Sequence, residues 1–148
     1  MSAHFSLPEL CASDYATRHG ISNRPPDDVA VANLGRLMDR LELIRSALGD
    51  RPVIVTSGYR SPAVNKAVGG SHMSAHMDGR AADIKVVGLA PRAVATILRD
   101  SGIPLDQLIL EFGLWVHVGI ERESFAPRKD VLTARSGVQG VGYVQGIV

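Results

Sequence analysis

A long amphipathic repeat in the first third of the chain constrains the fold more than any other feature of the sequence. Its apolar residues recur at intervals of three and four positions: Leu34, Leu37, Met38, Leu41, Ile44 and Leu48. This spacing predicts a helix from about Asp28 to Leu48, and Gly49 stands where a C-terminal glycine cap is expected. Because one face is continuously apolar, we expect the helix to pack into the core and to carry no chemistry.

The rest of the chain predicts short helices followed by strands. We expect helices over 7–19 and 89–101, a helical turn near 63–67, single strands over 51–56 and 81–87, and a hairpin over 108–112 and 115–120. Helices early and hairpin strands late favour an α+β fold, with N-terminal helices packed on a small, mainly antiparallel sheet. The segment 121–148 has only weak strand signals, around 141–144, and is left unassigned.

Composition predicts one ordinary globular domain spanning residues 1–148. A chain of 148 residues matches the usual size of one domain and can fold without a disulfide or an oligomer, so we expect a monomer. A net charge of +1 with three Phe, three Tyr and one Trp argues against nucleic-acid binding. The single cysteine, Cys11, excludes an internal disulfide and every cysteine-rich zinc site.

The sequence also bears on location. No apolar run approaches the roughly 18 residues that a membrane span needs, so we expect no membrane span. The first residues, Met1 to Ser6, lack the basic start and apolar stretch of a secretory signal, which predicts a protein that is cytoplasmic at synthesis.

The residues that carry chemistry lie in two patches. His76 and Asp83 are seven positions apart across a glycine, and His117 lies on a separate predicted strand. Two imidazoles and one carboxylate suffice to hold a catalytic zinc with a fourth position for water, although another divalent transition metal would accept the same donors. The spacing also occurs by chance, and His117 alone fits a core histidine between Val116 and Val118.

These patches belong to a wider set of motifs: Ser57-Gly-Tyr-Arg-Ser61, Asn65, Gly69-Gly-Ser71, Ser74-x-His76-x-x-Gly79-x-Ala81-x-Asp83 and Trp115-x-His117. In this order they resemble the zinc D-alanyl-D-alanine carboxypeptidase family, which belongs with the Hedgehog and lysostaphin-type metallopeptidases. The resemblance is closest to the small phage and prophage members and covers nearly the whole chain.

The resemblance implies roles for individual residues. It makes His76, Asp83 and His117 ligands of Zn²⁺. It places Arg60 near the substrate carbonyl or carboxylate, where a forked guanidinium suits either group. A surface arginine that caps a loop is the other interpretation of Arg60. Two more residues are expected to bind substrate: Ser74, which could instead orient His76, and Tyr59.

The general base is the point where the sequence departs from the family. Many relatives have an acid three positions before the last histidine, and here that position is Leu114. Glu111 is the nearest candidate, ahead of Asp78 and Asp106. A two-residue turn in the predicted hairpin would point Glu111 away from His117. A three-residue loop would pair Glu111 with Trp115 and place it on the face of His117.

The resemblance therefore implies a zinc metallopeptidase that cleaves peptidoglycan stem peptides at a D-Ala bond. Carboxypeptidase and crosslink-endopeptidase action both remain open. The alternative is a catalytically inactive, zinc-stabilised module that binds cell wall or protein, and the missing acid at Leu114 supports it. A cell-wall enzyme without an export signal suggests a phage lysis enzyme or a virion component.

Overall fold

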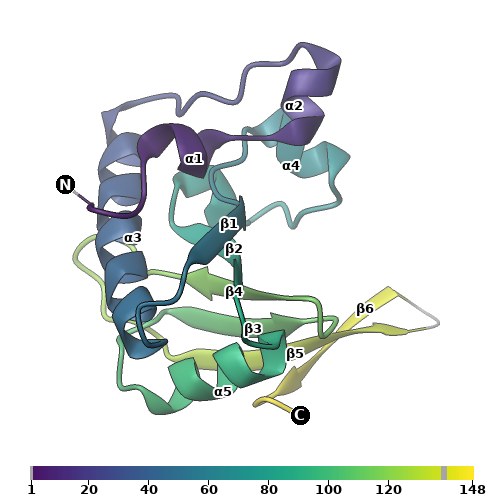
Figure 1. Cartoon of the computed structure of the whole chain (residues 1–148). Helices are drawn as coiled ribbons and strands as arrows, with labels where there is room; N and C mark the ends of the chain where they lie inside the picture. Colours follow the sequence, from purple (N-terminus) through teal and green to yellow (C-terminus); the bar gives the residue numbers. More distant parts are fainter. Residues whose placement is uncertain (1, 138–139) are drawn as a thin grey trace.

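The structure is a computed structural model that describes residues 2–137 and 140–148. Its helices are α1 (Leu7–Cys11), α2 (Asp14–His19), α3 (Asp28–Ala47), α4 (Pro62–Ala67), the 3-10 helix η1 (Ala75–Asp78) and α5 (Pro91–Asp100). Its strands are β1 (Val53–Ser57), β2 (Ala81–Val86), β3 (Gln107–Glu111), β4 (Trp115–Gly119), β5 (Asp130–Gly137) and β6 (Gly140–Gln145) (Figure 1).

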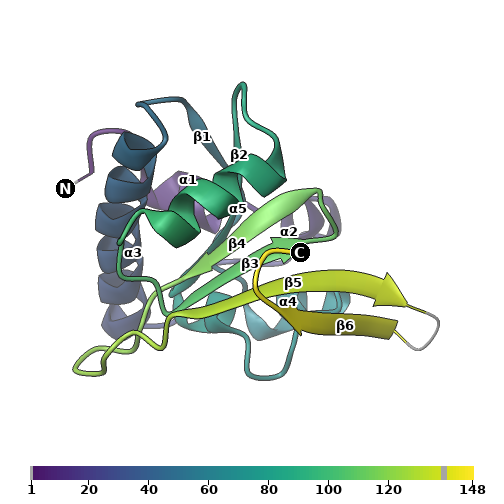
Figure 2. The same cartoon turned by 90° about the horizontal axis from the view of Figure 1, so that it is seen from below.

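The strands form one sheet in the order β1-β2-β4-β3-β5-β6. Every neighbouring pair is antiparallel except β3 and β5, which run parallel. Helix α3 stands beside the sheet, and α5 packs against β3 and β4 (Figures 1 and 2). The prediction of an α+β fold with a mainly antiparallel sheet is confirmed.

The apolar stripe of α3 lies in the core, as its spacing predicts. Leu34, Leu37, Leu41 and Ile44 are fully buried. The sheet contributes alternate residues of its central strands to the same core: Ala82, Ile84, Leu108, Leu110, Val116 and Val118. Because strand side chains alternate, the residues between these point to the opposite face of the sheet. Asp83, Ile109, Glu111 and His117 are therefore on that second face.

Two sequence-based assignments need correction. The helix expected over 7–19 is two helices. The backbone becomes extended at Ala12, which ends the first, and Ser13 caps the second, its hydroxyl accepting a hydrogen bond from the Ala16 amide at 3.1 Å. Residues 121–148, left unassigned, contain strands β5 and β6. Within the described residues, no helix is both long and apolar enough to cross a membrane.

Candidate metal centre and active site

Asp83 and His117 face each other across two neighbouring strands. Their positions are direct partners in the antiparallel register of β2 and β4. Side chains at such positions lie on the same face and within contact distance. The Asp83 Oδ1 atom lies 3.2 Å from His117 Nδ1, and both residues are buried.

His76 reaches the same point from η1, just before β2. The Ser74 hydroxyl caps this turn by accepting a hydrogen bond from the His76 amide at 3.2 Å. Gly79 then turns the chain into β2 at a φ of 74°, with the carbonyl oxygen of Ala30 in α3 2.8 Å from where a β-carbon would stand. Only glycine allows both the backbone angle and this close approach.

The ring of His76 is oriented by the backbone. Its Nδ1 lies 2.7 Å from the Gly58 carbonyl oxygen, which can only accept a hydrogen bond, so Nδ1 carries the proton. Burial lowers the pKa of His76 and favours the neutral ring. Nε2 is then left with a free lone pair directed at His117 and Asp83.

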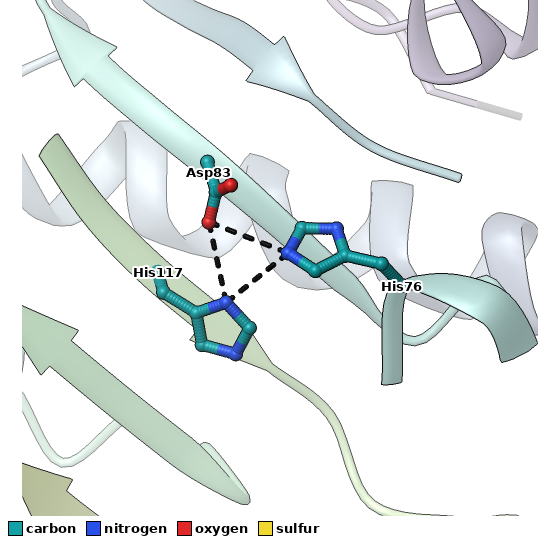
Figure 3. A group of neighbouring side chains, drawn as sticks. All are labelled: His76, Asp83 and His117. Atoms are coloured by element: carbon teal, nitrogen blue, oxygen red, sulfur yellow. Dashed lines mark hydrogen bonds and ion pairs between the residues drawn. The ribbon is translucent and has the colours of Figure 1, made fainter. Parts of the chain in front are cut away.

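The three donor atoms form a nearly equilateral triangle (Figure 3). His76 Nε2 lies 3.2 Å from His117 Nδ1 and 3.4 Å from Asp83 Oδ1, and the third side is 3.2 Å. Ligands bound tetrahedrally to zinc at about 2.0–2.1 Å are separated by about 3.3–3.4 Å. His76 Nε2 and Asp83 Oδ1 are both hydrogen-bond acceptors, so they cannot bond to each other. A cation bound by both atoms explains why they lie so close together. The residues present therefore fit zinc.

Asp83 stays charged in this setting. Burial raises its pKa, but the imidazoles of His117 and His76 beside it lower the pKa further, so the balance lies well below the ordinary value. A permanently ionised carboxylate completes the donor set that a dication requires.

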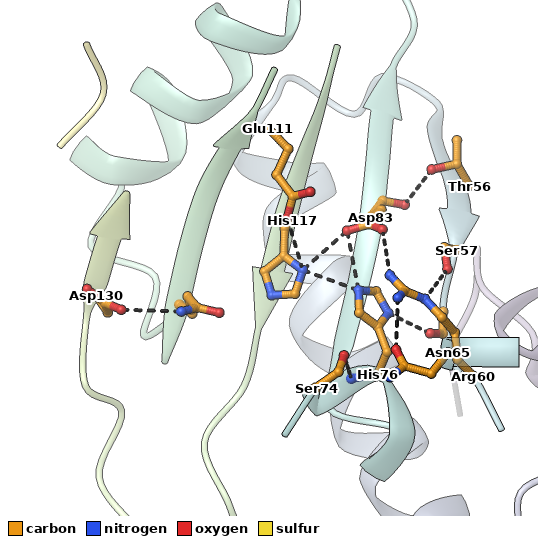
Figure 4. Close-up of polar contacts among 12 residues, drawn as sticks. Thr56, Ser57, Arg60, Asn65, Ser74, His76, Asp83, Glu111, His117 and Asp130 are labelled. Carbon is orange, nitrogen blue, oxygen red and sulfur yellow. Dashed lines mark hydrogen bonds and ion pairs between the residues drawn. The ribbon is translucent and has the colours of Figure 1, made fainter. Parts of the chain in front are cut away.

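Arg60 lies against the outer oxygen of Asp83 (Figure 4). Its Nη2 donates to Asp83 Oδ2 at 3.3 Å, its Nη1 to Asn65 Oδ1 at 3.1 Å, and its Nε to Ser57 Oγ at 3.1 Å. The side chain is only 14% exposed. This geometry makes Arg60 a group that orients Asp83, a role that the motif alone did not indicate.

Helix α1 supports the same loop through its backbone. The Tyr59 amide donates to the Leu10 carbonyl oxygen at 2.7 Å, and that oxygen lies 2.2 Å from where a β-carbon on Gly58 would stand. Tyr59 itself is 2% exposed and belongs to the hydrophobic core. Its burial gives Tyr59 a packing role, and because Tyr59 also borders the cleft, its contact with substrate stays a prediction.

Glu111 lies on the face of His117. The loop between β3 and β4 has three residues, Phe112 to Leu114, so Glu111 pairs with Trp115, which is the second of the two arrangements considered. Glu111 Oε1 is 3.8 Å from His117 Nδ1. Burial and the charge of Asp83 raise the pKa of Glu111, which makes the carboxylate more basic than an exposed one.

The other acid candidates are occupied or point elsewhere. Asp78 is paired with Arg80 at 2.9 Å, and Asp106 with Arg128 at 2.9 Å. Leu114, where the family resemblance leads us to expect an acid, is 57% exposed at the tip of the hairpin loop. Of the acids named from the sequence as candidate bases, Glu111 alone is placed beside the His–Asp–His cluster.

The cluster opens into a cleft of about 1430 Å³. The cleft is bordered by the loop around Gly70 and Ser74, by Trp115, whose ring meets Phe112 edge-to-face at 5.6 Å, and by the hairpin of β5 and β6. The indole nitrogen of Trp115 is buried and has no hydrogen-bond partner among the described residues. A cleft of this size exceeds the usual 300–1,000 Å³ or so of small-ligand sites, and so accommodates an extended molecule.

Comparison with known proteins relates this geometry to a family. A family model described as Peptidase M15 matches residues 3–119. The chain is also 35% identical over 101 residues to the zinc D-Ala-D-Ala carboxypeptidase of Streptomyces albus G. That similarity covers 67% of this chain but only 38% of the relative, so the chain corresponds to well under half of that protein.

Proposed function

The chain belongs to the Peptidase M15 family, and on that premise we propose that it is a zinc-dependent peptidase that cleaves peptidoglycan stem peptides at a D-Ala bond. The observation that carries this proposal is the triangle of His76, Asp83 and His117 with a free carboxylate, Glu111, beside it. The similarity to the zinc D-Ala-D-Ala carboxypeptidase of Streptomyces albus G supports a substrate with a D-Ala bond. We propose that this protein acts at the bacterial cell wall, as a phage lysis enzyme or a virion component.

His76, Asp83 and His117 would hold the zinc ion. Zinc in such a site lowers the pKa of water from 15.7 to about 7 and polarises a carbonyl oxygen. Gly58 and Arg60 keep two of these side chains in place: the Gly58 carbonyl fixes the ring of His76, and Arg60 fixes the carboxylate of Asp83. Groups that orient ligands in this way raise metal affinity.

Glu111 is the proposed general base. It would take a proton from the attacking water and deliver it to the amine released by cleavage, a contribution of roughly 10²–10⁴-fold. Its place on the cleft face supports this role, as does the burial that raises its pKa.

Arg60 has a secondary place in this mechanism. Its three hydrogen bonds to Ser57, Asn65 and Asp83 leave two of the five guanidinium N–H groups for a substrate carbonyl or carboxylate. Ser74 caps the turn that carries His76, which supports its orienting role over direct substrate contact.

A second candidate function is a zinc-stabilised binding module without catalysis. The absence of an acid at Leu114 favours it, since Glu111 comes from the other strand of the hairpin. The two functions differ in what removal of the Glu111 carboxylate does: a peptidase loses hydrolysis, whereas a binding module loses nothing.

The test is mass spectrometry of purified sacculi, stem pentapeptides and crosslinked dimers after incubation with the zinc-loaded protein. A chelator-treated sample and Glu111→Gln serve as controls. Loss of one terminal alanine identifies a carboxypeptidase, and loss of crosslinked dimers identifies an endopeptidase. If neither product forms while zinc is bound at a stoichiometry of about one per chain, the binding module replaces the peptidase.

A further inference from the structure

The hairpin of β5 and β6 lies beyond the residues that the family model matches, 3–119. It nevertheless borders the cleft that contains the His–Asp–His cluster, because the parallel pairing of β3 and β5 extends the sheet past Glu111 (Figure 2). The hairpin therefore forms part of the cleft wall from residues that the family model does not match.

The strand register puts Tyr143 in line with Glu111. Glu111 pairs with Ala134 on β5, and Ala134 pairs with Tyr143 on β6. Paired residues on neighbouring strands point to the same face of a sheet, so Glu111, Ala134 and Tyr143 form one row. The two outer members of this row, Glu111 and Tyr143, border the cleft. Val141, two positions from Tyr143, faces the same way and also borders the cleft.

Tyr143 is the accessible member of this row. Its side chain is 59% exposed, whereas the small side chain of Ala134 beneath it is buried. Burial of part of the phenol and the charge of Glu111 raise the pKa of Tyr143.

The base of the hairpin is anchored. The Thr133 hydroxyl donates to the Gly146 carbonyl oxygen at 2.7 Å and accepts from the Val148 amide at 3.1 Å. Arg92 in α5 donates to the Val148 carbonyl oxygen at 2.8 Å. These contacts connect both strands and the residues after them to the rest of the fold, so Tyr143 is presented from a supported strand.

We propose that Tyr143 forms a distal subsite for the peptide substrate, with its ring packed against a residue remote from the scissile bond. This inference rests on the peptidase function proposed above. Two strand spacings of about 4.8 Å separate the backbone positions of Glu111 and Tyr143. An extended peptide covers that distance in about three residues at 3.3–3.6 Å each. Tyr143 therefore contacts long substrates and not dipeptides.

The experiment is a substrate-length series. Tyr143→Ala and Tyr143→Phe are compared with Val144→Ala, a matched control on the same strand, because Val144 pairs with Thr133 and points to the opposite face. KM and kcat are measured with a blocked D-Ala-D-Ala dipeptide, a stem pentapeptide and a crosslinked dimer. Dissociation constants for all three are measured by calorimetry with the zinc-loaded Glu111→Gln protein carrying each change.

Loss of one aromatic contact predicts a rise of about 2- to 12-fold in KM and in the dissociation constant of the long peptides for Tyr143→Ala. We expect kcat and the dipeptide values to stay within about twofold of wild type, and Tyr143→Phe to restore long-peptide binding because the ring remains. Val144→Ala should match wild type, and all variants should retain zinc.

Equal long-peptide binding by Tyr143→Ala and Val144→Ala would overturn the subsite, as would a loss of the same size with the dipeptide. A Tyr143→Phe protein as weak as Tyr143→Ala would overturn the ring contact. These outcomes are distinct from failure of the peptidase function, in which wild type itself cleaves none of the three substrates.

Discussion

The two flanks of the His–Asp–His cluster are built in opposite ways. On one flank Arg60 is held by Ser57, Asn65 and Asp83 and is largely buried. On the other flank Glu111 faces the cleft, and its nearest ionic partner, His117 Nδ1, is 3.8 Å away, beyond a normal hydrogen bond. We propose that this difference separates the two tasks of a metallopeptidase site: the Arg60 flank holds the ligands, and the Glu111 flank keeps a carboxylate available to exchange protons.

The largest expected effect tests the Glu111 flank. Glu111→Gln should lower kcat by about 10²–10⁴-fold, because an amide cannot accept the proton of the attacking water. Zinc content should not change, since the three ligands are intact. Activity assays combined with metal analysis check this, with the exposed Glu123→Gln as the control. A Glu111→Gln protein that loses its zinc would instead place Glu111 among the groups that hold the metal.

The second-largest expected effect tests the Arg60 flank. Arg60→Lys removes the fork that joins Asp83, Asn65 and Ser57, and should weaken zinc affinity about 10- to 100-fold. Competition with a fluorescent chelator measures the affinity, and the exposed Arg18→Lys is the matched control. If zinc affinity is unchanged and only KM rises or kcat falls, Arg60 acts on the substrate, as the family resemblance implied.

A third prediction concerns Gly58, the backbone support next to Arg60. Gly58→Ala places a β-carbon against the Leu10 carbonyl oxygen and displaces the carbonyl that orients His76. We expect a loss of about 1–3 kcal/mol in the free energy of unfolding, measured in urea. Gly35→Ala in α3 meets nothing within 4 Å and should instead stabilise the protein by about 0.4–1 kcal/mol. Equal free energies of unfolding for the two variants would show that the close approach of Gly58 to Leu10 does not disfavour a β-carbon.

The smallest expected effect is on the pH dependence of the free energy of unfolding, measured after a chelator has removed the zinc. Because the pKa of Glu111 is raised in the folded state, the neutral carboxyl favours folding, and that stabilisation is present in full at low pH. It is lost as the pH rises from the ordinary glutamate range through the raised pKa. Relative to Glu111→Gln, wild type should therefore lose stability over this interval, as urea unfolding at several pH values would show. If the stability of the two proteins changed with pH in parallel, the pKa of Glu111 would not be raised in the folded state.

The sequence predicts the parts of this molecule that follow a regular spacing. The stripe from Leu34 to Leu48 identifies α3, and the hairpin around Gly113 could be placed because strand alternation leaves only two arrangements for Glu111. The choice between them could not be made from the sequence, since it depends on the loop, where Phe112 adopts a φ of 56° and Gly113 a φ of 67°.

Contacts between distant segments were beyond prediction. The orientation of Arg60 depends on Asn65 and Asp83, which come from a helix and a strand that only the folded chain brings together. Strand β5 was missed because it pairs in parallel with β3, from which the whole of β4 separates it in the sequence. Such pairing leaves no local turn signal, unlike a hairpin.

The position of Trp115 has a consequence for spectroscopy. It is the chain's single tryptophan, and its ring borders the cleft next to Phe112 while its indole nitrogen is shielded from water. All indole emission from this protein therefore originates at the cleft. The wild-type chain thus carries a built-in optical probe, through which metal loading and peptide entry can be followed without a label.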